Sequence, residues 1–542
     1  MNPRFLARLA GVVPFLPGLL AFIAIVGPRA VDPRNLAWLK SGDPATQYLG
    51  WLFFRQSEWT FPPGLNPDYG LELASSIVYS DSIPLLAMFF KLFDNWLPQP
   101  FQYFGLWLLA CFLLQGYFAW KLVGLMSSDI VLRLLASTLL VFSPPMLARL
   151  SGHWSLVAHF LILAALYLAL RPGGERRRLA WMALLAIATL VHAYFVAMLG
   201  LFWLADLAAR AWQRRIVMKA ALLEVAALAA VVIITAWLAG YFSITSGVAA
   251  GSYYGYFRAN LLTFIDPGSW SIVLRDLPEG PGDYEGFNYL GLGVMLLAIT
   301  VLPLIPAVTR DCGKQMARHR HVLIAAASLG AFALSHQLGI GVRTFVLPLP
   351  AIFIEMAETF RSSGRMLWPA FYLLTLAIVY VVVRGNSRRV AAVLLALAVL
   401  AQVLDTSAAW RHVRGNLMVA RQDTLATPPA DPFWELAAAR YDEIRVLPPG
   451  NAPTYWLHIA AFAGTHGMAT NAAYLARIDE PSLGNAWTEA MAMIATGNYE
   501  ADTLYILDAS VVEQASATVA SNEDMLRQID GVFVLAPGWL AE

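Results

Sequence analysis

Long apolar runs separated by short polar stretches dominate the first 405 residues of the chain. A helix needs roughly 20 mainly apolar residues to cross the hydrocarbon core of a bilayer. The pattern predicts about eleven such spans, at 9–27, 101–125, 130–147, 154–170, 179–192, 193–209, 219–241, 287–308, 321–339, 365–384 and 389–405. Because the polar run His192-Ala193-Tyr194 divides the fifth span from the sixth, we predict two short helices there rather than one long helix.

The region from residue 406 to residue 542 has a different pattern, with short apolar runs between polar ones. The predicted strands are Glu443–Leu447, Leu504–Leu507 and Val532–Leu535, and helices are predicted at Pro453–Ala463 and Ser521–Ile529. The pattern therefore predicts two domains. A multi-pass α-helical membrane domain covers residues 1–405, and a small α/β domain covers residues 406–542.

Basic residues gather in the connections on one side of the predicted spans. These clusters are Arg4 with Arg8, Arg176 to Arg178, Arg210 with Arg214, Arg215 and Lys219, Arg310 to His321, and Arg384 with Arg388 and Arg389. Since cytoplasmic loops carry an excess of Lys and Arg, this side is predicted to be cytoplasmic, with the N-terminus inside. An odd number of spans then places the C-terminal domain outside, together with the long segments 28–100, 242–286 and 340–364.

Composition supports a membrane protein and excludes several classes. Hydrophobic residues make up 58% of the chain and charged residues only 13%, whereas soluble domains carry about 25% charged residues. The net charge of +1 gives no basis for nucleic-acid binding. The two cysteines, Cys111 in an apolar span and Cys312 in a basic loop, imply no disulfide framework.

The first long outer segment contains two aspartates with possible chemical roles. Asp43 precedes Pro44 and a predicted interfacial helix, Asp43–Trp59, that carries Tyr48 and many apolar residues. Asp43 is therefore either the N-cap of that helix or a general base, and the two roles are compatible. Asp81 either caps the apolar stretch Ile83–Phe93, which is too short to span, or serves as a second acid or a metal ligand.

The run Arg361-Ser362-Ser363-Gly364-Arg365 lies at the outer end of a predicted span. Two guanidinium groups and the backbone N–H groups of a helix start suit a phosphate, so we predict a phosphate-binding site here. The alternative is that Arg361 and Arg365 only reach toward lipid headgroups. The weaker phosphate candidates are Arg258 and Arg343, and further candidates for a substrate pocket are Tyr48, His153, His192 and Glu355.

The layout resembles the GT-C superfamily of membrane glycosyltransferases, and more closely a bacterial membrane-protein family of unassigned function. The runs that carry this resemblance are 42–51, 79–84, 152–159 and 360–369. The resemblance covers roughly the first 400 residues. It implies a donor sugar linked to a polyprenyl phosphate, a glycan, lipid or protein acceptor, and an active site on the outer face of the bacterial inner membrane.

In the implied mechanism Asp43, alone or with Asp81, accepts the proton of an acceptor hydroxyl. The hydroxyl displaces the lipid phosphate with inversion, and the arginines hold the leaving charge. We expect no cofactor, and a divalent metal ion stays an open alternative without a clear ligand set. Two other hypotheses are a transporter or flippase of lipid-linked glycan intermediates, and a non-catalytic membrane protein that binds envelope polymers.

Overall fold

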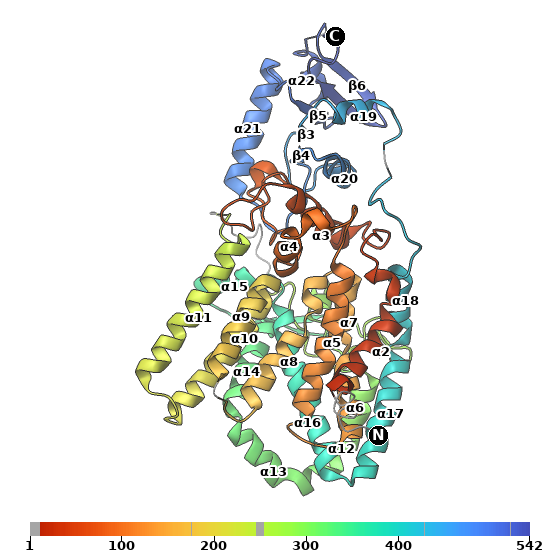
Figure 1. Ribbon diagram of the computed structural model, residues 1–542. Coiled ribbons are helices and arrows are strands. Elements are labelled where there is room, and N and C mark those ends of the chain that lie inside the picture. The colour runs from red at the N-terminus through yellow and green to blue at the C-terminus, as the bar shows by residue number, and fades with distance from the viewer. Residues whose placement is uncertain (1–10, 175, 245–253, 428, 521, 542) are drawn as a thin grey trace. The chain divides into compact units, whose positions relative to one another are not determined.

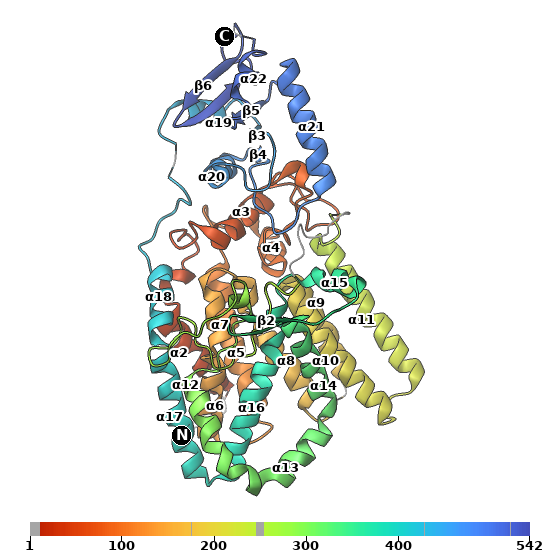
Figure 2. The same ribbon diagram turned by 180° about the vertical axis from the view of Figure 1, so that it is seen from behind.

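The computed structural model of the protein (Figures 1 and 2) describes residues 11–174, 176–244, 254–427, 429–520 and 522–541. The predicted basic residues Arg4 and Arg8 lie outside the described residues. The chain forms two compact units. The helical unit comprises Met1–Asp32, Tyr103–Val232 and Val248–Val419, and the mixed unit comprises Pro33–Gln102, Ile233–Gly247 and Ala420–Glu542.

The helical unit is built from helices joined mostly by short connections. Its longer helices are α2 (Leu16–Ile25), α5 (Phe104–Val123), α6 (Ile130–Val141), α8 (Phe160–Leu170), α9 (Arg177–Val191), α10 (Ala193–Trp212), α12 (Leu292–Val301), α13 (Ile305–Arg318), α14 (Arg320–Leu334), α16 (Trp368–Gly385), α17 (Arg388–Asp405) and α18 (Ser407–Leu417). Shorter elements are α7 (Pro144–Ala148), α15 (Ala351–Ala357) and a hairpin of β1 (Gln337–Ile340) and β2 (Arg343–Val346). Helix α11 (Met218–Ala239) runs from the helical unit into the mixed unit.

The apolar helices are those of a membrane-embedded protein. Among the described residues, five helices are long and apolar enough to cross a membrane, or seven if each of two bent pairs forms one span. Among the described residues each predicted span overlaps at least one helix, and the predicted break at His192 between α9 and α10 is confirmed. The count of eleven spans and their orientation stay predictions.

Helices α2 and α5 pack closely because glycines lie where they cross. A Cβ atom on Gly18 of α2 would lie 2.0 Å from the backbone oxygen of Phe112 in α5. A Cβ atom on Gly116 of α5 would lie 3.0 Å from the backbone nitrogen of Gly18. Small residues at such crossings let two backbones approach each other within a membrane.

The mixed unit contains a five-stranded sheet in the order β4-β3-β5-β7-β6. Its strands are β3 (Glu443–Leu447), β4 (Ala469–Thr470), β5 (Thr503–Leu507), β6 (Met525–Ile529) and β7 (Val532–Ala536). Strand β3 is parallel to β4 and β5, while β7 is antiparallel to β5 and β6. The three predicted strands are confirmed as β3, β5 and β7.

The predicted helix over Ser521–Ile529 is wrong, because Met525–Ile529 forms strand β6. Residues Asp530 and Gly531 follow with φ angles of 48° and 86° and connect β6 to β7. Asp-Gly is favoured in two-residue hairpin turns because both central residues need positive φ. The hairpin signal was present in the sequence and outweighs the weak helical pattern before it.

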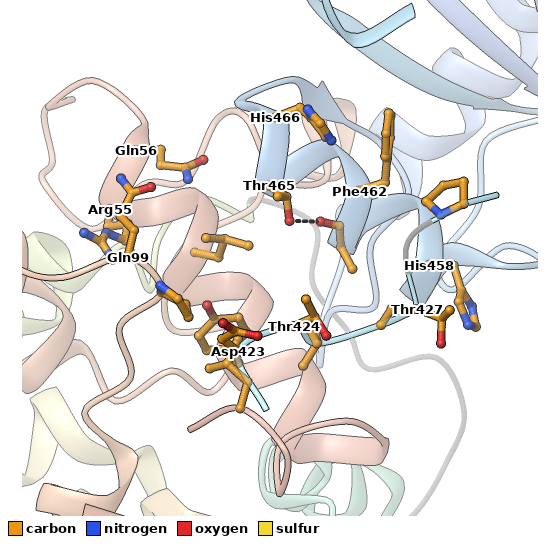
Figure 3. Close-up of a pocket in the computed structure, with 18 of the residues that line it drawn as sticks. Arg55, Gln56, Gln99, Asp423, Thr424, Thr427, His458, Phe462, Thr465 and His466 are labelled. Atoms are coloured by element: carbon orange, nitrogen blue, oxygen red, sulfur yellow. Dashed lines mark hydrogen bonds between the residues drawn. The ribbon is translucent and has the colours of Figure 1, made fainter. Parts of the chain in front are cut away.

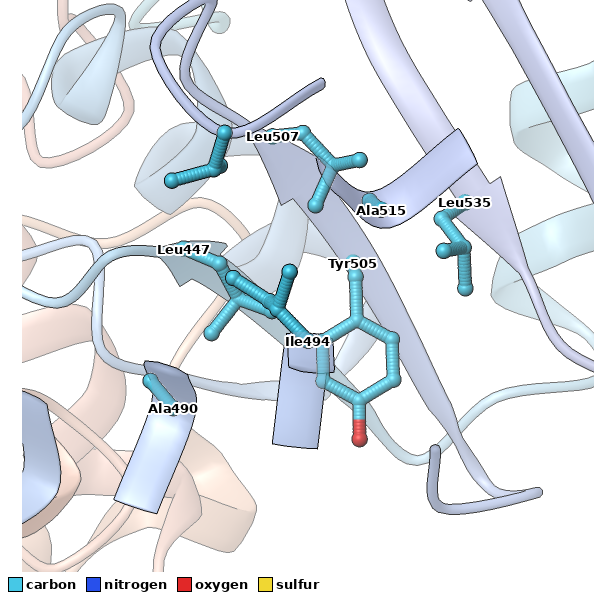
Figure 4. Close-up of a cluster of buried hydrophobic side chains, with 8 residues drawn as sticks. Leu447, Ala490, Ile494, Tyr505, Leu507, Ala515 and Leu535 are labelled. Carbon is cyan, nitrogen blue, oxygen red and sulfur yellow. The ribbon is translucent and has the colours of Figure 1, made fainter. Parts of the chain in front are cut away.

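Apolar side chains fill one face of this sheet (Figure 4). Helix α21 (Glu480–Thr496) supplies Ala490 and Ile494, which contact Tyr505 and Leu507 of β5. The mixed unit also contains α19 (Phe433–Ala438), α20 (Trp456–His466) and α22 (Val512–Ser516). The helix predicted at Pro453–Ala463 is confirmed as α20.

Residues 33–102, which include most of the first segment predicted to lie outside, fold together with the C-terminal region. The segment contains α3 (Gly42–Gln56) and α4 (Pro84–Lys91), both of which lie in the mixed unit. The backbone of Asp68 to Gly70 pairs with Thr470 of β4, through the bonds Thr470 N to Asp68 O (2.9 Å) and Gly70 N to Thr470 O (2.8 Å). This division differs from the predicted one, which assigned the outer segment to a membrane domain over residues 1–405.

Candidate functional site

Helix α3 begins two residues earlier than the Asp43-Pro44 pair predicted. Ser41 occupies the N-cap position with extended backbone angles, so Asp43 lies in the first helical turn and is not the N-cap. A carboxylate in the first turn is still favoured by the positive end of the helix dipole. A helix is confirmed over most of the predicted range Asp43–Trp59, with Tyr48 buried within it, and its position at the membrane interface stays a prediction.

Asp81 lies in a segment of unusual backbone conformation. The φ angles of Leu71, Ala74, Asp81 and Ile83 are 45°, 55°, 55° and 54°. Non-glycine residues in this region cost about 1–3 kcal/mol each and gather at functional sites. Ile83 is the N-cap of α4 and no side chain caps that helix, so the predicted capping role of Asp81 is wrong.

The structure brings Asp43 and Asp81 to the same face of α3. The side-chain amide of Gln47 donates to Asp81 Oδ2 at 3.4 Å. Asp43 precedes Gln47 by one helical turn, so the two side chains project from one face of the helix. Ser82 Oγ donates to the backbone oxygen of Gln47 at 2.7 Å and holds the Asp81 loop on this face.

Gly50 allows this close contact between α3 and the Asp81 loop. A Cβ atom at Gly50 would lie 2.0 Å from Ser80 Oγ and 2.6 Å from Ser82 Oγ. Tyr79, next to this loop, donates from its hydroxyl to the backbone oxygen of Tyr241 at 2.6 Å. Burial raises the pKa of Tyr79, although the nearby Arg477 guanidinium opposes this shift.

The helical unit contains a second buried carboxylate, Glu285, bound by two arginines. Arg149 Nη1 and Arg365 Nε each donate to Glu285 Oε2 at 2.9 Å, and His153 Nε2 lies 3.9 Å from Oε1. The side chains of Arg149, Arg365 and Glu285 are 7%, 9% and 8% exposed. Burial alone would raise the pKa of Glu285, but Arg365 and Arg149 outweigh it and hold that pKa well below its usual range.

We call Arg149, His153, Glu285 and Arg365 the Glu285 cluster. Two guanidinium groups face one carboxylate, so these three groups carry a net charge of +1. The Arg365 guanidinium also lies 5.0 Å from the centre of the Tyr194 ring. A buried, positively charged cluster of this kind can attract a phosphate more strongly than an exposed one, because water screens it less.

Two regions of the chain match known family descriptions. Residues 15–407 match the family described as Domain of unknown function (DUF6311). The chain belongs to the DUF6311 family. Residues 433–537 match the DUF6311 C-terminal domain. No curated protein matches the chain.

The DUF6311 domain, residues 15–407, includes Asp43, Asp81 and the whole Glu285 cluster. The C-terminal DUF6311 domain includes α19 to α22 and all five strands of the mixed sheet. The two family matches thus follow the chain in order, whereas the compact units combine residues 33–102 with the C-terminal region.

The predicted phosphate-binding residues of the DUF6311 domain occupy different environments. Arg365 lies in the Glu285 cluster, and Arg361 is exposed with its guanidinium 5.8 Å from the centre of the Phe257 ring. Ser362 and Ser363 are buried. The backbone N–H of Ser362 donates to the Tyr194 hydroxyl at 2.7 Å, and Ser363 Oγ donates to Ala333 O at 3.4 Å.

Arg258 has a structural role in the DUF6311 domain. Its Nε donates to Asp283 at 3.0 Å, and its other nitrogens donate to Gln337 O at 2.5 Å and Thr344 Oγ1 at 2.8 Å. These bonds join the outer segment to both strands of the β1–β2 hairpin. Arg258 therefore differs from the open phosphate ligand that was predicted, and Arg343 is exposed at the start of β2.

The predicted pocket residues are also spread over both units. His192 accepts a hydrogen bond at Nδ1 from the backbone N–H of Tyr194 (3.3 Å), at the start of α10. His153 belongs to the Glu285 cluster with its side chain 36% exposed. Glu355 is exposed on α15. Tyr48 of α3 lines a cavity in the mixed unit.

Sequence reasoning missed Arg149 and Glu285. A signal for Arg149 existed, because it is a single charged residue between two long apolar runs and four positions before His153. Glu285 gave no such signal, since it follows several other acidic residues in a long loop. In the part of the chain that the structure describes, no group of three or more His, Cys, Asp or Glu side chains is placed to hold a metal ion.

Proposed function

We propose that this membrane protein is a glycosyltransferase. It moves a sugar from a polyprenyl-phosphate-linked donor to a glycan, lipid or protein acceptor at the outer face of the bacterial inner membrane. The observation that carries the proposal is the environment of Asp81. This residue has a left-handed backbone conformation, and its carboxylate accepts a hydrogen bond from Gln47 of α3. Asp43 projects from the same face of α3 as Gln47.

Such a carboxylate suits general-base catalysis on an acceptor hydroxyl. Asp81 takes the hydroxyl proton while the oxygen forms a bond to the anomeric carbon of the donor sugar. The bond between that carbon and the phosphate oxygen breaks, and its electron pair leaves with the lipid phosphate. This single displacement inverts the anomeric centre. Asp43, in the first turn of α3, is the second acid of the predicted pair.

The Glu285 cluster supports a role in binding the lipid phosphate. Arg149 and Arg365 supply two guanidinium groups whose planar donor geometry matches phosphate oxygens. Glu285 fixes both groups in place through bonds of 2.9 Å, so little reorganisation is needed when an anion arrives.

The position of the Glu285 cluster along α10 supports the outer orientation. Tyr194, beside Arg365, lies at the start of this 20-residue helix. Near its other end, Arg210 joins a buried network with Asp206 and Glu224, which also includes the basic residue Arg177. A helix of 20 residues is about 30 Å long, which equals the hydrocarbon thickness of a bilayer. If the basic end is cytoplasmic, the Glu285 cluster is at the outer surface.

The test is a transfer assay with purified protein and a panel of polyprenyl-phosphate-linked sugars, measuring release of the lipid phosphate. We expect release with the wild type and with Glu58→Gln, a matched control at an exposed acid of the same unit. We expect release to be lost in Asp81→Asn while binding of the donor is kept. Equal release by wild type and Asp81→Asn would reject the assignment.

A second candidate function is transport of lipid-linked intermediates, favoured by a buried polar network among the helices. The Tyr372 hydroxyl lies 2.8 Å from His159 Nδ1 and 3.0 Å from both Gln115 Nε2 and Ser143 Oγ. Ionisable residues buried inside a membrane domain often line transport paths. Vesicles that contain the protein would then move a fluorescent polyprenyl-linked sugar across the bilayer without releasing phosphate, and His159→Ala would slow that movement.

A further inference from the structure

The opposite face of α3 lines a cavity of about 380 Å³ within the mixed unit. Its wall comes mainly from α3, from the segment that begins at Asp423 and from α20, and the remaining lining residues are Leu36, Gln99, Pro100 and Glu435. Figure 3 shows Gln56 and Gln99 on one side of the cavity and Thr465 and Phe462 of α20 on the other. This volume lies within the range of about 300–1,000 Å³ that small-ligand sites occupy.

The geometry of α3 separates this cavity from the Asp81 site. Tyr48, Leu52 and Gln56 line the cavity and are spaced by four residues, so they share one helical face. Gln47, which contacts Asp81, projects roughly 100° away from Tyr48 around the helix, and Asp43 projects farther still. The cavity is therefore a second site and not an extension of the first.

The cavity wall is tightly packed where α3 and α20 meet. A Cβ atom at Gly464 of α20 would lie 2.7 Å from Leu52 Cδ2 and 3.1 Å from the Phe53 ring. The Phe462 ring packs against the Trp434 ring at 5.4 Å and the His466 ring at 4.5 Å, measured between ring centres. These contacts preform the aromatic part of the wall, which reduces the entropy lost on binding.

The chemistry of the lining fits a neutral ligand rich in hydroxyl groups. The amides of Gln56 and Gln99 and the hydroxyl of Thr424 can both donate and accept hydrogen bonds, and the Thr465 hydroxyl, which donates to Ala461 O, can accept. Asp423 adds an acceptor, and the Phe462 side chain adds an apolar surface. A phosphate is disfavoured, since Asp423 and Glu435 are acidic and the Arg55 guanidinium is already bound to Asp94 at 2.6 Å.

We propose that this cavity is a carbohydrate-binding site for a short neutral oligosaccharide. Sugar hydroxyls need donors and acceptors at close spacing, and the apolar face of a sugar ring needs a flat apolar partner. The cavity supplies both from side chains of the mixed unit alone. This proposal does not depend on the transferase activity, because it concerns binding at a different face of α3.

The experiment uses the full chain, purified in a detergent without a sugar headgroup. Ligand-observed NMR with maltotriose, chitotriose and mannotriose measures binding, and inorganic phosphate serves as the anionic comparison. Thr465→Trp fills the cavity, whereas Thr488→Trp on α21 is the matched control. Both threonines are exposed and both donate to the carbonyl four residues earlier, Ala461 at 2.7 Å and Gly484 at 2.9 Å.

We expect at least one of the three oligosaccharides to bind the wild type and Thr488→Trp equally. Its affinity should fall at least about tenfold in Thr465→Trp and in Asp423→Ala, which removes only an exposed acceptor. If the tryptophan of Thr465→Trp disturbs folding, Asp423→Ala is the variant that tests the proposal. Absence of binding to the wild type, unchanged binding in Asp423→Ala, or displacement of the sugar by phosphate would overturn the proposal.

Discussion

Two carboxylates in this protein are held in opposite ways. Glu285 is buried, and both of its arginine partners bond to one carboxylate oxygen at 2.9 Å. Asp81 is only partly buried and accepts a bond from the neutral amide of Gln47 at 3.4 Å. Glu285 lies in a turn of ordinary backbone conformation, whereas Asp81 has a φ of 55° in a segment with three other such residues.

These environments suit the two carboxylates to different roles. The guanidinium groups of Arg365 and Arg149 outweigh the effect of burial and hold the pKa of Glu285 well below its usual range, so Glu285 is a weaker base than an ordinary carboxylate and serves as a fixed anion that orders two cations. Asp81 has the restrained backbone that suits a reacting group. Three substitutions and one pH dependence test this division of roles.

Asp81→Asn should lower the rate of sugar transfer by about 10²–10⁴-fold, the usual contribution of a general base. Asparagine tolerates the left-handed conformation well and still accepts a bond from Gln47, so folding should be kept. Transfer is measured by release of lipid phosphate, with Asp43→Asn assayed beside it. If only Asp43→Asn loses activity, the base is Asp43 and the comparison with Asp81 fails.

Glu285→Gln should destabilise the helical unit by about 3–5 kcal/mol, because it leaves two buried guanidinium groups without their anion. Thermal unfolding of the purified protein in detergent measures this effect. Glu355→Gln, at an exposed acid of the same unit, should change stability by less than about 0.5 kcal/mol. Equal melting of the two variants would show that Glu285 does not organise the arginines.

Gly50→Ala should lower the free energy of unfolding by about 1–3 kcal/mol. Its new methyl group would overlap Ser80 and Ser82 and displace the Asp81 loop from α3. Transfer activity should fall together with stability. The matched control is Gly484→Ala on α21, where a Cβ atom meets nothing within 4 Å. Alanine is favoured over glycine inside a helix, so the control should melt at the same or a higher temperature.

The stabilising effect of Glu285 should also depend on pH. An acid with a folded pKa below its unfolded value of about 4.3 stabilises the fold above that pH, and the effect is lost as the pH falls. The difference in melting temperature between wild type and Glu285→Gln should therefore be constant near neutrality and narrow below about pH 4.3. A difference that widens in acid would contradict the pairing with Arg149 and Arg365.

Several residues of the candidate site could be predicted from local sequence, but the side chains that they contact could not. Asp81, Arg365 and His153 were identified from their positions next to apolar runs. Glu285 and Arg149, separated by 136 positions, meet only in the folded chain. Arg258 was predicted to bind phosphate, and its actual contacts are with Asp283, Gln337 and Thr344. Charge alone could not distinguish a ligand-binding arginine from one that joins two loops.

The apolar helices and three of the seven described strands, β3, β5 and β7, could be predicted from the amino-acid sequence, because hydrophobic periodicity and apolar length are local properties that each element satisfies on its own. The grouping of residues 33–102 with the C-terminal region and the sharing of Glu285 by two arginines appear only in the folded chain. The backbone hydrogen bond between Gly70 and Thr470 joins positions 400 residues apart. Nearly every residue type has the same main-chain donor and acceptor, so the sequence does not indicate which backbone groups will pair.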